Sequence, residues 1–292
     1  MSRIESGFKL LGVLICLSFM SIPEMHLAVE WTLVAVILLT VGIPHGAIDH
    51  LLSNPQLERK SFFGFLFRYI LLIVLYLGLW YIAPIPALIA FLVMSAYHFG
   101  QSHFLNQDLP EKMAWSVFGL RGAYFLSAIL LGDLEATRDI LGPIVDVWIP
   151  AEAKVWIVLG FGVASVMSQL LFGPKLKLTH MLELVILAPL LFFSPLLVSF
   201  VVYFGFWHSV PSMLVEYAYL KKFTFSNTPW KFGIQLLPFS VISIIGIGIL
   251  LGLGLKFLSG QELILMFFVL ISLISFPHIL YMDGFLKSQN QN

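Results

Sequence analysis

Long apolar runs separated by short polar breaks recur along the whole chain. A run of about 20 apolar residues is long enough to cross the hydrocarbon layer of a bilayer as a helix. The runs cover residues 8–23, 28–52, 62–82, 85–105, 114–132, 154–173, 178–194, 196–220, 232–257 and 262–285. The pattern predicts an all-α, polytopic transmembrane helix bundle of about 8–10 helices. We expect ten, and the first and seventh runs are the shortest.

The longest connection between runs is GDLEATRDILGPIVDVWIPAEAK, residues 132–154. We expect a short interfacial helix within it, because it is too short for a separate soluble domain. The first run follows Arg3 and Lys9 and resembles a signal peptide, but no small-residue cleavage site follows it. We therefore expect an uncleaved helix and a single integral membrane domain over residues 1–292, located in the cell membrane.

Lysine and arginine residues in the loops predict the orientation, because cytoplasmic loops are enriched in them. A cytoplasmic N-terminus places eleven of them inside: Arg3, Lys9, Arg59, Lys60, Lys112, Lys175, Lys177, Lys221, Lys222, Lys231 and Lys287. Only Arg138, Lys154 and Lys256 then lie outside. The asymmetry favours a cytoplasmic N-terminus.

Composition agrees with this class and narrows the chemistry. Hydrophobic residues make up 59% of the chain and charged residues 11%, which is too apolar for a soluble domain. The net charge is zero, so nothing indicates a nucleic-acid partner. The single cysteine, Cys16, excludes an intramolecular disulfide, a cysteine-ligated zinc site and an iron–sulfur cluster. Any bound metal therefore needs histidine and carboxylate ligands.

Six of the eight histidines fall in the inner halves of the four even-numbered runs that contain histidine. They are His45 and His50 in the second run, His98 and His103 in the fourth, His208 in the eighth and His278 in the tenth. With the predicted orientation, all six share one layer near the cytoplasmic face. Ionisable groups at such depth are costly and need a partner or a task. They either form hydrogen bonds between helices or bind a shared metal ion.

Helical spacing selects among these histidines. At about 100° per residue, His45 and Asp49 share a helix face, whereas His45 and His50 diverge by roughly 140°. Each helix is thus expected to contribute one inward imidazole. Asp49 either fixes the tautomer of an imidazole or is a charge at the helix end. The same relations hold in the fourth run for His98, Ser102 and His103.

Proline precedes two of the histidines, at Pro44–His45 and Pro277–His278. A proline inside a helix removes a backbone hydrogen bond and bends the helix, so we expect a local kink to aim both imidazoles. Gly42 and Gly46 flank the first pair and leave room for a neighbouring helix or a ligand.

Aromatic residues surround the histidines in sequence. They either pack between helices or form the wall of an apolar channel, which would make them candidates for substrate binding. These candidates are Tyr97, Phe99, Phe204, Phe206 and Trp207.

Four segments, GIPHGAIDH, AYHFG, FWHS and FPHILYMD, together resemble the Brp/Blh family of membrane-integral β-carotene 15,15′-dioxygenases. The resemblance covers nearly the whole chain, with the motifs in the same order. It implies an iron(II) enzyme that uses O2 to split the central double bond of β-carotene into two retinal molecules, with His45, His98 and His208 as ligands. The family pattern commonly offers a further histidine where this chain has Ser212. Either His278 completes the set, or three histidines bind the metal, or the substrate or reaction differs.

The resemblance also implies partners and supporting residues. β-Carotene dissolves in the bilayer, so it can enter sideways between helices without charged recognition groups. An opsin that accepts the retinal is a possible further partner. The residues expected to support the metal ligands are Asp49, His50, Ser102, His103 and Ser212.

Two other functions compete with this interpretation. A di-iron hydroxylase or desaturase acting on a carotenoid or lipid would need clustered patterns such as HxxxH or HxxHH, and the sequence has neither. A histidine-containing membrane transporter would need broken helices in both halves, of which only the Pro-His pairs give a hint.

Overall fold

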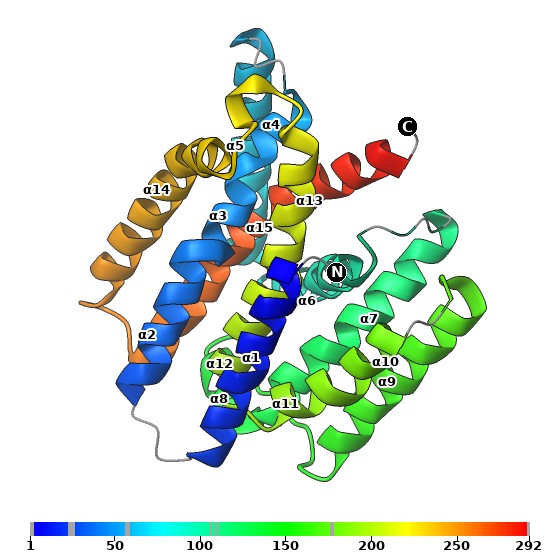
Figure 1. The fold of residues 1–292 in the computed structure, drawn as a ribbon. Coiled ribbons are helices and arrows are strands. Elements are labelled where there is room, and N and C mark those ends of the chain that lie inside the picture. Colours follow the sequence, from blue (N-terminus) through cyan, green and yellow to red (C-terminus); the bar gives the residue numbers. More distant parts are fainter. Residues whose placement is uncertain are drawn as a thin grey trace. The chain divides into compact units, whose positions relative to one another are not determined.

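The computed structural model describes residues 3–22, 27–55, 59–105, 107, 109, 111–175 and 178–290. Within these ranges the chain forms helices joined by short connections, and Figure 1 shows no strand. The all-α fold class predicted from the sequence is thereby confirmed.

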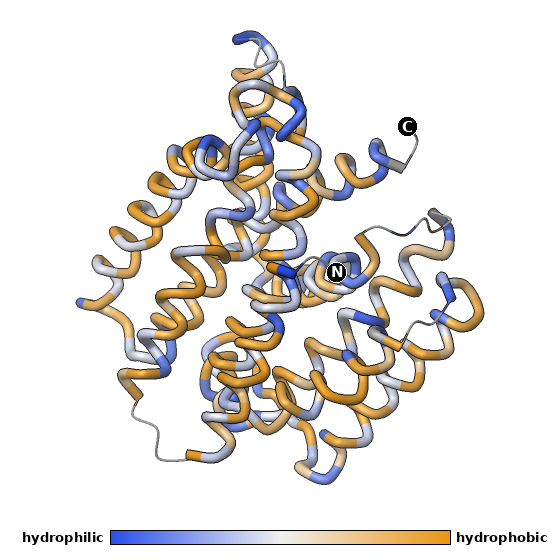
Figure 2. Tube along the Cα trace, viewed as in Figure 1, coloured by the Kyte–Doolittle hydropathy of each residue, from blue (hydrophilic) through white to orange (hydrophobic). Residues whose placement is uncertain are grey.

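Nine helical segments of the described chain are long and apolar enough to cross a membrane. Most of their length is hydrophobic (Figure 2), and many of their large apolar side chains are exposed, which suits contact with lipid. The chain is thus a multi-pass membrane protein. The segments are α1 (Arg3–Ser21), Leu27–Ser53, α5 (Arg59–Ile82), Pro84–Phe104, α7 (Glu111–Gly132), α9 (Ala153–Phe172), Leu196–Leu220, α14 (Pro229–Gly254) and α15 (Gly260–Asn290).

The run expected at residues 178–194 is not a tenth full span. It forms three short consecutive elements, α10 (Leu178–Leu182), η4 (Glu183–Leu187) and α11 (Ala188–Phe192). A helix of this length falls short of the roughly 30 Å hydrocarbon layer. The expectation of ten spans was therefore wrong at this run, although nine lies within the predicted range.

The short helix predicted between residues 132 and 154 is present as α8 (Leu134–Leu141). Its N-terminus is capped by Asp133, whose side chain accepts a hydrogen bond from the backbone N–H of Ala136 at 3.2 Å.

Three segments of the described chain widen into π-helix, and each ends two residues before a proline. Proline has no N–H, and its ring crowds the carbonyl four residues earlier, so a wider turn before it relieves the helix. These segments are η1 (Leu38–Gly42) before Pro44, η4 before Pro189 and η5 (Tyr203–Ser209) before Pro211. In contrast, α15 runs as one α-helix through Pro277. The two Pro-His pairs thus sit in different local structure: the first follows a π-helical segment and the second lies within one continuous α-helix.

The span Leu27–Ser53 changes its helix type four times. It runs from α2 (Leu27–Ile37) through η1, α3 (Ile43–His45) and the 3₁₀ turn η2 (Gly46–Ile48) to α4 (Asp49–Ser53). Pro84–Phe104 consists of α6 (Pro84–Gln101) and the 3₁₀ turn η3 (Ser102–Phe104), and Leu196–Leu220 of α12 (Leu196–Val202), η5 and α13 (Val210–Leu220).

The chain divides into two compact units. Unit 1 comprises residues 1–38, 95–142 and 146–211, and unit 2 comprises residues 39–94, 143–145 and 212–292. The boundaries near residues 38, 94 and 211 fall inside helical spans, so three spans contribute residues to both units.

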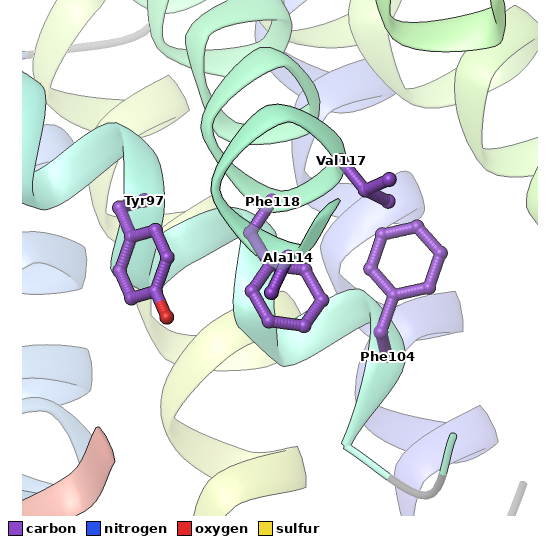
Figure 3. Close-up of a cluster of buried hydrophobic side chains, with 5 residues drawn as sticks. All are labelled: Tyr97, Phe104, Ala114, Val117 and Phe118. Carbon is purple, nitrogen blue, oxygen red and sulfur yellow. The ribbon is translucent and has the colours of Figure 1, made fainter. Parts of the chain in front are cut away.

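In unit 1, α6 and α7 approach until their backbones touch. A Cβ atom on Gly100 would lie 1.8 Å from the carbonyl oxygen of Phe118, and one on Gly122 would lie 1.7 Å from that of Ala96. Only glycine fits at either place. This crossing fixes the last turn of α6, which carries His98. Beside it, a cluster of buried apolar side chains fills the interface with α7 (Figure 3): Tyr97, Phe104, Ala114, Val117 and Phe118.

Unit 1 also buries a charged side chain. Arg121 of α7 is fully buried, and its Nε donates to Ser165 Oγ of α9 at 3.0 Å. Its Nη2 donates to Gln169 Oε1 on the same helix, and its guanidinium lies 5.3 Å from the ring centroid of Phe104. These contacts help to join α7 to α9, the two helices that lie side by side in Figure 1.

In unit 2, α15 packs against α5 and α4, and α14 packs against α3 and η2. Trp80 of α5 donates from Nε1 to Ser272 Oγ of α15 at 3.0 Å, and the Tyr76 hydroxyl donates to the Ala87 carbonyl at 2.9 Å. The residues around His45 thus pack against α14.

Gly100→Ala should destabilise the protein, because a methyl group there overlaps backbone that no rotamer change can move away. We expect a loss of at least about 1–3 kcal/mol, the usual cost of overpacking, measured as a lower unfolding temperature of the detergent-solubilised protein. Gly119→Ala on α7 is the matched control, since nothing lies within 4 Å of its Cβ position. Equal stability of the two variants would contradict the close crossing.

Candidate metal centre

Two buried histidines pair in unit 1. His98 comes from the last turn of α6 and His208 from η5, with 4% and 1% of their surfaces exposed. Their ring centroids are 4.5 Å apart and the ring planes are nearly perpendicular, at 72°. A ring nitrogen of His98 and a ring nitrogen of His208 lie within 4.8 Å of each other. Two imidazoles at this separation are close enough to bind one metal ion.

The Nδ1 atoms of this pair are engaged within unit 1. Gln101 Oε1 lies 3.3 Å from His98 Nδ1, and an amide oxygen can only accept, so this nitrogen donates. The Ser102 hydroxyl donates to the His98 carbonyl at 3.4 Å and accepts from His208 Nδ1 at 2.6 Å. In both rings the proton therefore sits on Nδ1, and Nε2 carries the lone pair that a metal requires.

A second pair lies in unit 2. His45 of α3 and His278 of α15 are both 3% exposed, and their ring centroids are 4.4 Å apart at 84°. One ring nitrogen of each again lies within 4.8 Å of the other. A Cβ on Gly46 would lie 3.5 Å from His278 Nδ1, so this ring packs directly against the glycine backbone.

Asp49 forms a hydrogen bond with the ring of His278. His278 Nδ1 donates to Asp49 Oδ1 at 2.8 Å, and the other carboxylate oxygen accepts from the Tyr69 hydroxyl at 3.2 Å. Because a carboxylate accepts, the His278 proton is on Nδ1 and the lone pair on Nε2. Asp49 thus contacts the imidazole of another helix rather than that of His45, whose helix face it was expected to share.

Glu216 lies beside the remaining ring and was not among the residues selected from the sequence. It belongs to α13, is completely buried, and places Oε1 4.0 Å from His45 Nδ1. The available signal was an acidic residue within the apolar run 196–220, at a depth where acids are rare.

Comparisons with known proteins identify the family of the chain. A family profile described as beta-carotene 15,15′-dioxygenase matches residues 36–285. The chain belongs to this family. Members of it are enzymes, and so is this protein.

Two relatives show the extent of the similarity. The beta-carotene 15,15′-dioxygenase of uncultured marine bacterium 66A03 is 25% identical over 264 residues, which are 87% of this chain and 93% of the relative. The probable beta-carotene 15,15′-dioxygenase Blh of Halobacterium salinarum is 28% identical over 201 residues, 58% of this chain and 56% of the relative. No solved structure matches the chain.

Of the residues expected to support the ligands, His103 belongs to a different network of unit 1. Its Nδ1 lies 2.9 Å from Glu183 Oε2 and its Nε2 lies 3.0 Å from the Tyr203 hydroxyl. Glu183 also pairs with Lys9 at 2.6 Å. Both ring nitrogens are therefore engaged in hydrogen bonds.

His50 and Ser212 are the other two such candidates, and both lie in unit 2. The ring of His50 is surrounded by phenylalanines, with centroid distances of 6.1 Å to Phe62, 6.3 Å to Phe65 and 4.8 Å to Phe239. A cavity of about 10 Å³ beside it has room for no more than one water molecule. Ser212 is buried in α13, one turn before Glu216.

Two of the five aromatic candidates lie against the unit 1 pair. The ring centroids of Phe99 and Phe204 are 5.0 Å and 5.6 Å from that of His208, and the Phe204 ring is nearly parallel to it. These two side chains form an apolar wall next to the imidazole.

The other three aromatic candidates face elsewhere in unit 1. Tyr97 packs on Trp115 and Phe118 of α7, in the cluster of Figure 3. Phe206 contacts a ring of α1, and Trp207 lies against α1 at Gly12 and under the Lys9 ammonium. These contacts are packing between helices.

His50→Phe should leave enzyme activity unchanged, because its ring occupies a phenylalanine-lined site. Its Nδ1 is buried without a hydrogen-bond partner in the described part of the chain, so the apolar replacement should leave stability within about 1 kcal/mol of the original or raise it. Product formation and the unfolding temperature check this. A loss of activity as large as that of His45→Ala would show instead that His50 supports the centre.

Proposed function

We propose that the chain binds one iron(II) ion through His45, His98, His208 and His278 and cleaves the central double bond of β-carotene with O2, giving two retinal molecules. The observation that supports this most is the common arrangement of the two histidine pairs. Both are buried, and three of the four rings have Nδ1 engaged by a neighbour in the same unit, the tautomer in which Nε2 carries the lone pair that a metal requires.

The side chains present suit iron(II). Neutral imidazole is a good ligand for iron, and no thiol competes because Cys16 is the only cysteine. When bound, the iron would supply the electrons that activate O2. The protein's own contribution is to hold the imidazoles in one tautomer and to keep water away from them.

His278 completes the ligand set in this proposal. It makes up for Ser212, which stands where relatives of the resembled family commonly offer a histidine. His278 pairs with His45 inside unit 2 and is held by Asp49 through a 2.8 Å hydrogen bond. A metal-binding histidine usually donates its other ring N–H to such a carboxylate.

The substrate class is supported by the names of the relatives and by the apolar surroundings. The curated relatives are named as β-carotene dioxygenases, and a polyene needs an apolar wall rather than charged groups. Phe99 and Phe204 provide such a wall beside His208. We propose that these two rings, and not Tyr97, Phe206 or Trp207, contact the substrate.

Expression in bacteria that make β-carotene tests the function directly. We expect the orange colour to fade and retinal to appear by chromatography. Ala replacements at His45, His98, His208 and His278 should each abolish retinal formation while the protein remains in the membrane, since each removes a ligand. Retained activity in two or more of these variants would refute the ligand set.

Iron analysis of the purified protein separates the proposal from its rivals. We expect close to one iron per chain, and a reduced content in each of the four alanine variants. Two irons per chain would favour a di-iron hydroxylase or desaturase, and absence of metal together with absence of retinal would favour a transporter.

Phe204→Leu tests the apolar wall. Losing the aromatic contact should lower kcat/KM for β-carotene by roughly two- to tenfold, with iron content unchanged. Phe206→Leu, in the same turn but packed on α1, is the matched control and should keep its kcat/KM. Equal effects in the two variants would contradict this assignment.

A further inference from the structure

Glu216 is an acid buried in unit 2 that lacks ordinary partners. It is completely inaccessible to solvent, and neither carboxylate oxygen accepts a hydrogen bond within the described residues. The acid lies beside His45, whose Nδ1 is 4.0 Å from Oε1. An isolated buried carboxylate costs several kcal/mol or more and persists only where something offsets the cost.

Asp49 provides the comparison inside the same unit. It is similarly buried, at 2% exposure, and accepts from His278 Nδ1 at 2.8 Å. The pair of unit 2 is therefore flanked by two acids, each directed at the Nδ1 atom of one ring. The difference is that Asp49 forms its hydrogen bond with His278, whereas the distance between Glu216 Oε1 and His45 Nδ1 is about 1 Å too long for one.

We propose that Glu216 is a positioning residue, whose carboxylate accepts a hydrogen bond from His45 Nδ1–H and balances charge when the metal is bound. The inference rests on the proposed function. Four neutral imidazoles leave both charges of an iron(II) ion uncompensated, and Asp49 and Glu216 supply two negative charges from one layer beyond the ligands. In an apolar interior a bound cation is the largest local charge, and neutralisation at that range stabilises it.

The arrangement gives Glu216 a role that packing alone does not require. Ser212 lies one turn earlier on the same face of α13 and has a small side chain. Glu216 is therefore the longer of the two polar side chains on this face. A leucine of similar volume would fill the same space without the cost of burying a carboxylate. In the proposed site, the buried carboxylate of Glu216 is thus explained by the positive charge of the bound iron ion.

The experiment compares four variants of the full-length detergent-solubilised protein with the original. Glu216→Gln removes the charge at nearly constant shape, Glu216→Asp keeps the charge but withdraws it, and Asp49→Asn is the reference for the established hydrogen bond. Glu262→Gln is the control, because this acid of unit 2 is only partly buried and accepts a hydrogen bond from the Ser259 backbone N–H at the start of α15. Iron affinity is measured by anaerobic competition with a chelator, the reduction potential of the bound iron by redox titration, and folding by thermal unfolding.

Glu216→Gln should weaken iron binding by roughly 10–100-fold, the usual effect of losing such a partner, as should Asp49→Asn. It should also raise the reduction potential, because one negative charge that favours the ferric state is gone. Glu216→Asp should weaken binding less than Glu216→Gln, with a potential near the original. Glu262→Gln should change neither quantity. A merely structural role would lower the unfolding temperature without moving the potential.

If the original protein binds iron while Glu216→Gln keeps its affinity and potential, the role of Glu216 is refuted and the proposed function stands. Should Glu216→Gln fail to fold, Glu216→Asp carries the test, and an unchanged affinity in that variant refutes the role. A protein that binds no iron at all would overturn the proposed function and this inference together.

Discussion

The histidine pairs depend on hydrogen bonds that their Nδ1 atoms donate. A ring N–H buried in an apolar interior costs about 1–3 kcal/mol if it has no acceptor, and three of the four imidazoles have one within their own unit. That one bond fixes the tautomer and points Nε2 away from the acceptor. The acceptors are Gln101 for His98, Ser102 for His208 and Asp49 for His278.

Helix irregularity decides which acceptor meets which ring. On a regular α-helix, Asp49 would lie on the face of His45. The intervening turn η2 is 3₁₀, in which each residue advances about 120° rather than 100°, so Asp49 is carried round toward α15 and meets His278. The π-helical segments before the prolines act in the same way. Each contains an extra residue in a turn, and this shifts every later side chain by about 100° around the helix.

Composition and length predict the membrane spans of this chain well. Nine spans match apolar runs, and the short helix α8 lies where it was expected. The run at residues 178–194 failed because hydropathy does not register where a helix stops: the helical elements α10, η4 and α11 end at Phe192 and are together too short to span the membrane. Helical spacing already places Phe204 and Phe206 on different faces, about 160° apart, but it does not show which of the two faces His208 and which faces α1.

Histidine chemistry was predictable only in part, for a related reason. The sequence predicted that six imidazoles share one depth, but it could not predict which of them find acceptors of their own. His103 was considered near the ligands, yet Glu183 and Tyr203 bind both of its nitrogens. Contacts between distant segments decide such cases, and spacing along one helix carries no information about them.

The buried charges of the two units differ in a way that bears on function. In unit 1 the acid Glu183 is matched by Lys9 at 2.6 Å, so its charge is balanced by a side chain. In unit 2, neither Asp49 nor Glu216 forms an ion pair with lysine or arginine among the described residues, and each faces an imidazole. In the proposed metal-bound protein the histidines are neutral, so the divalent ion itself would balance the charges of Asp49 and Glu216.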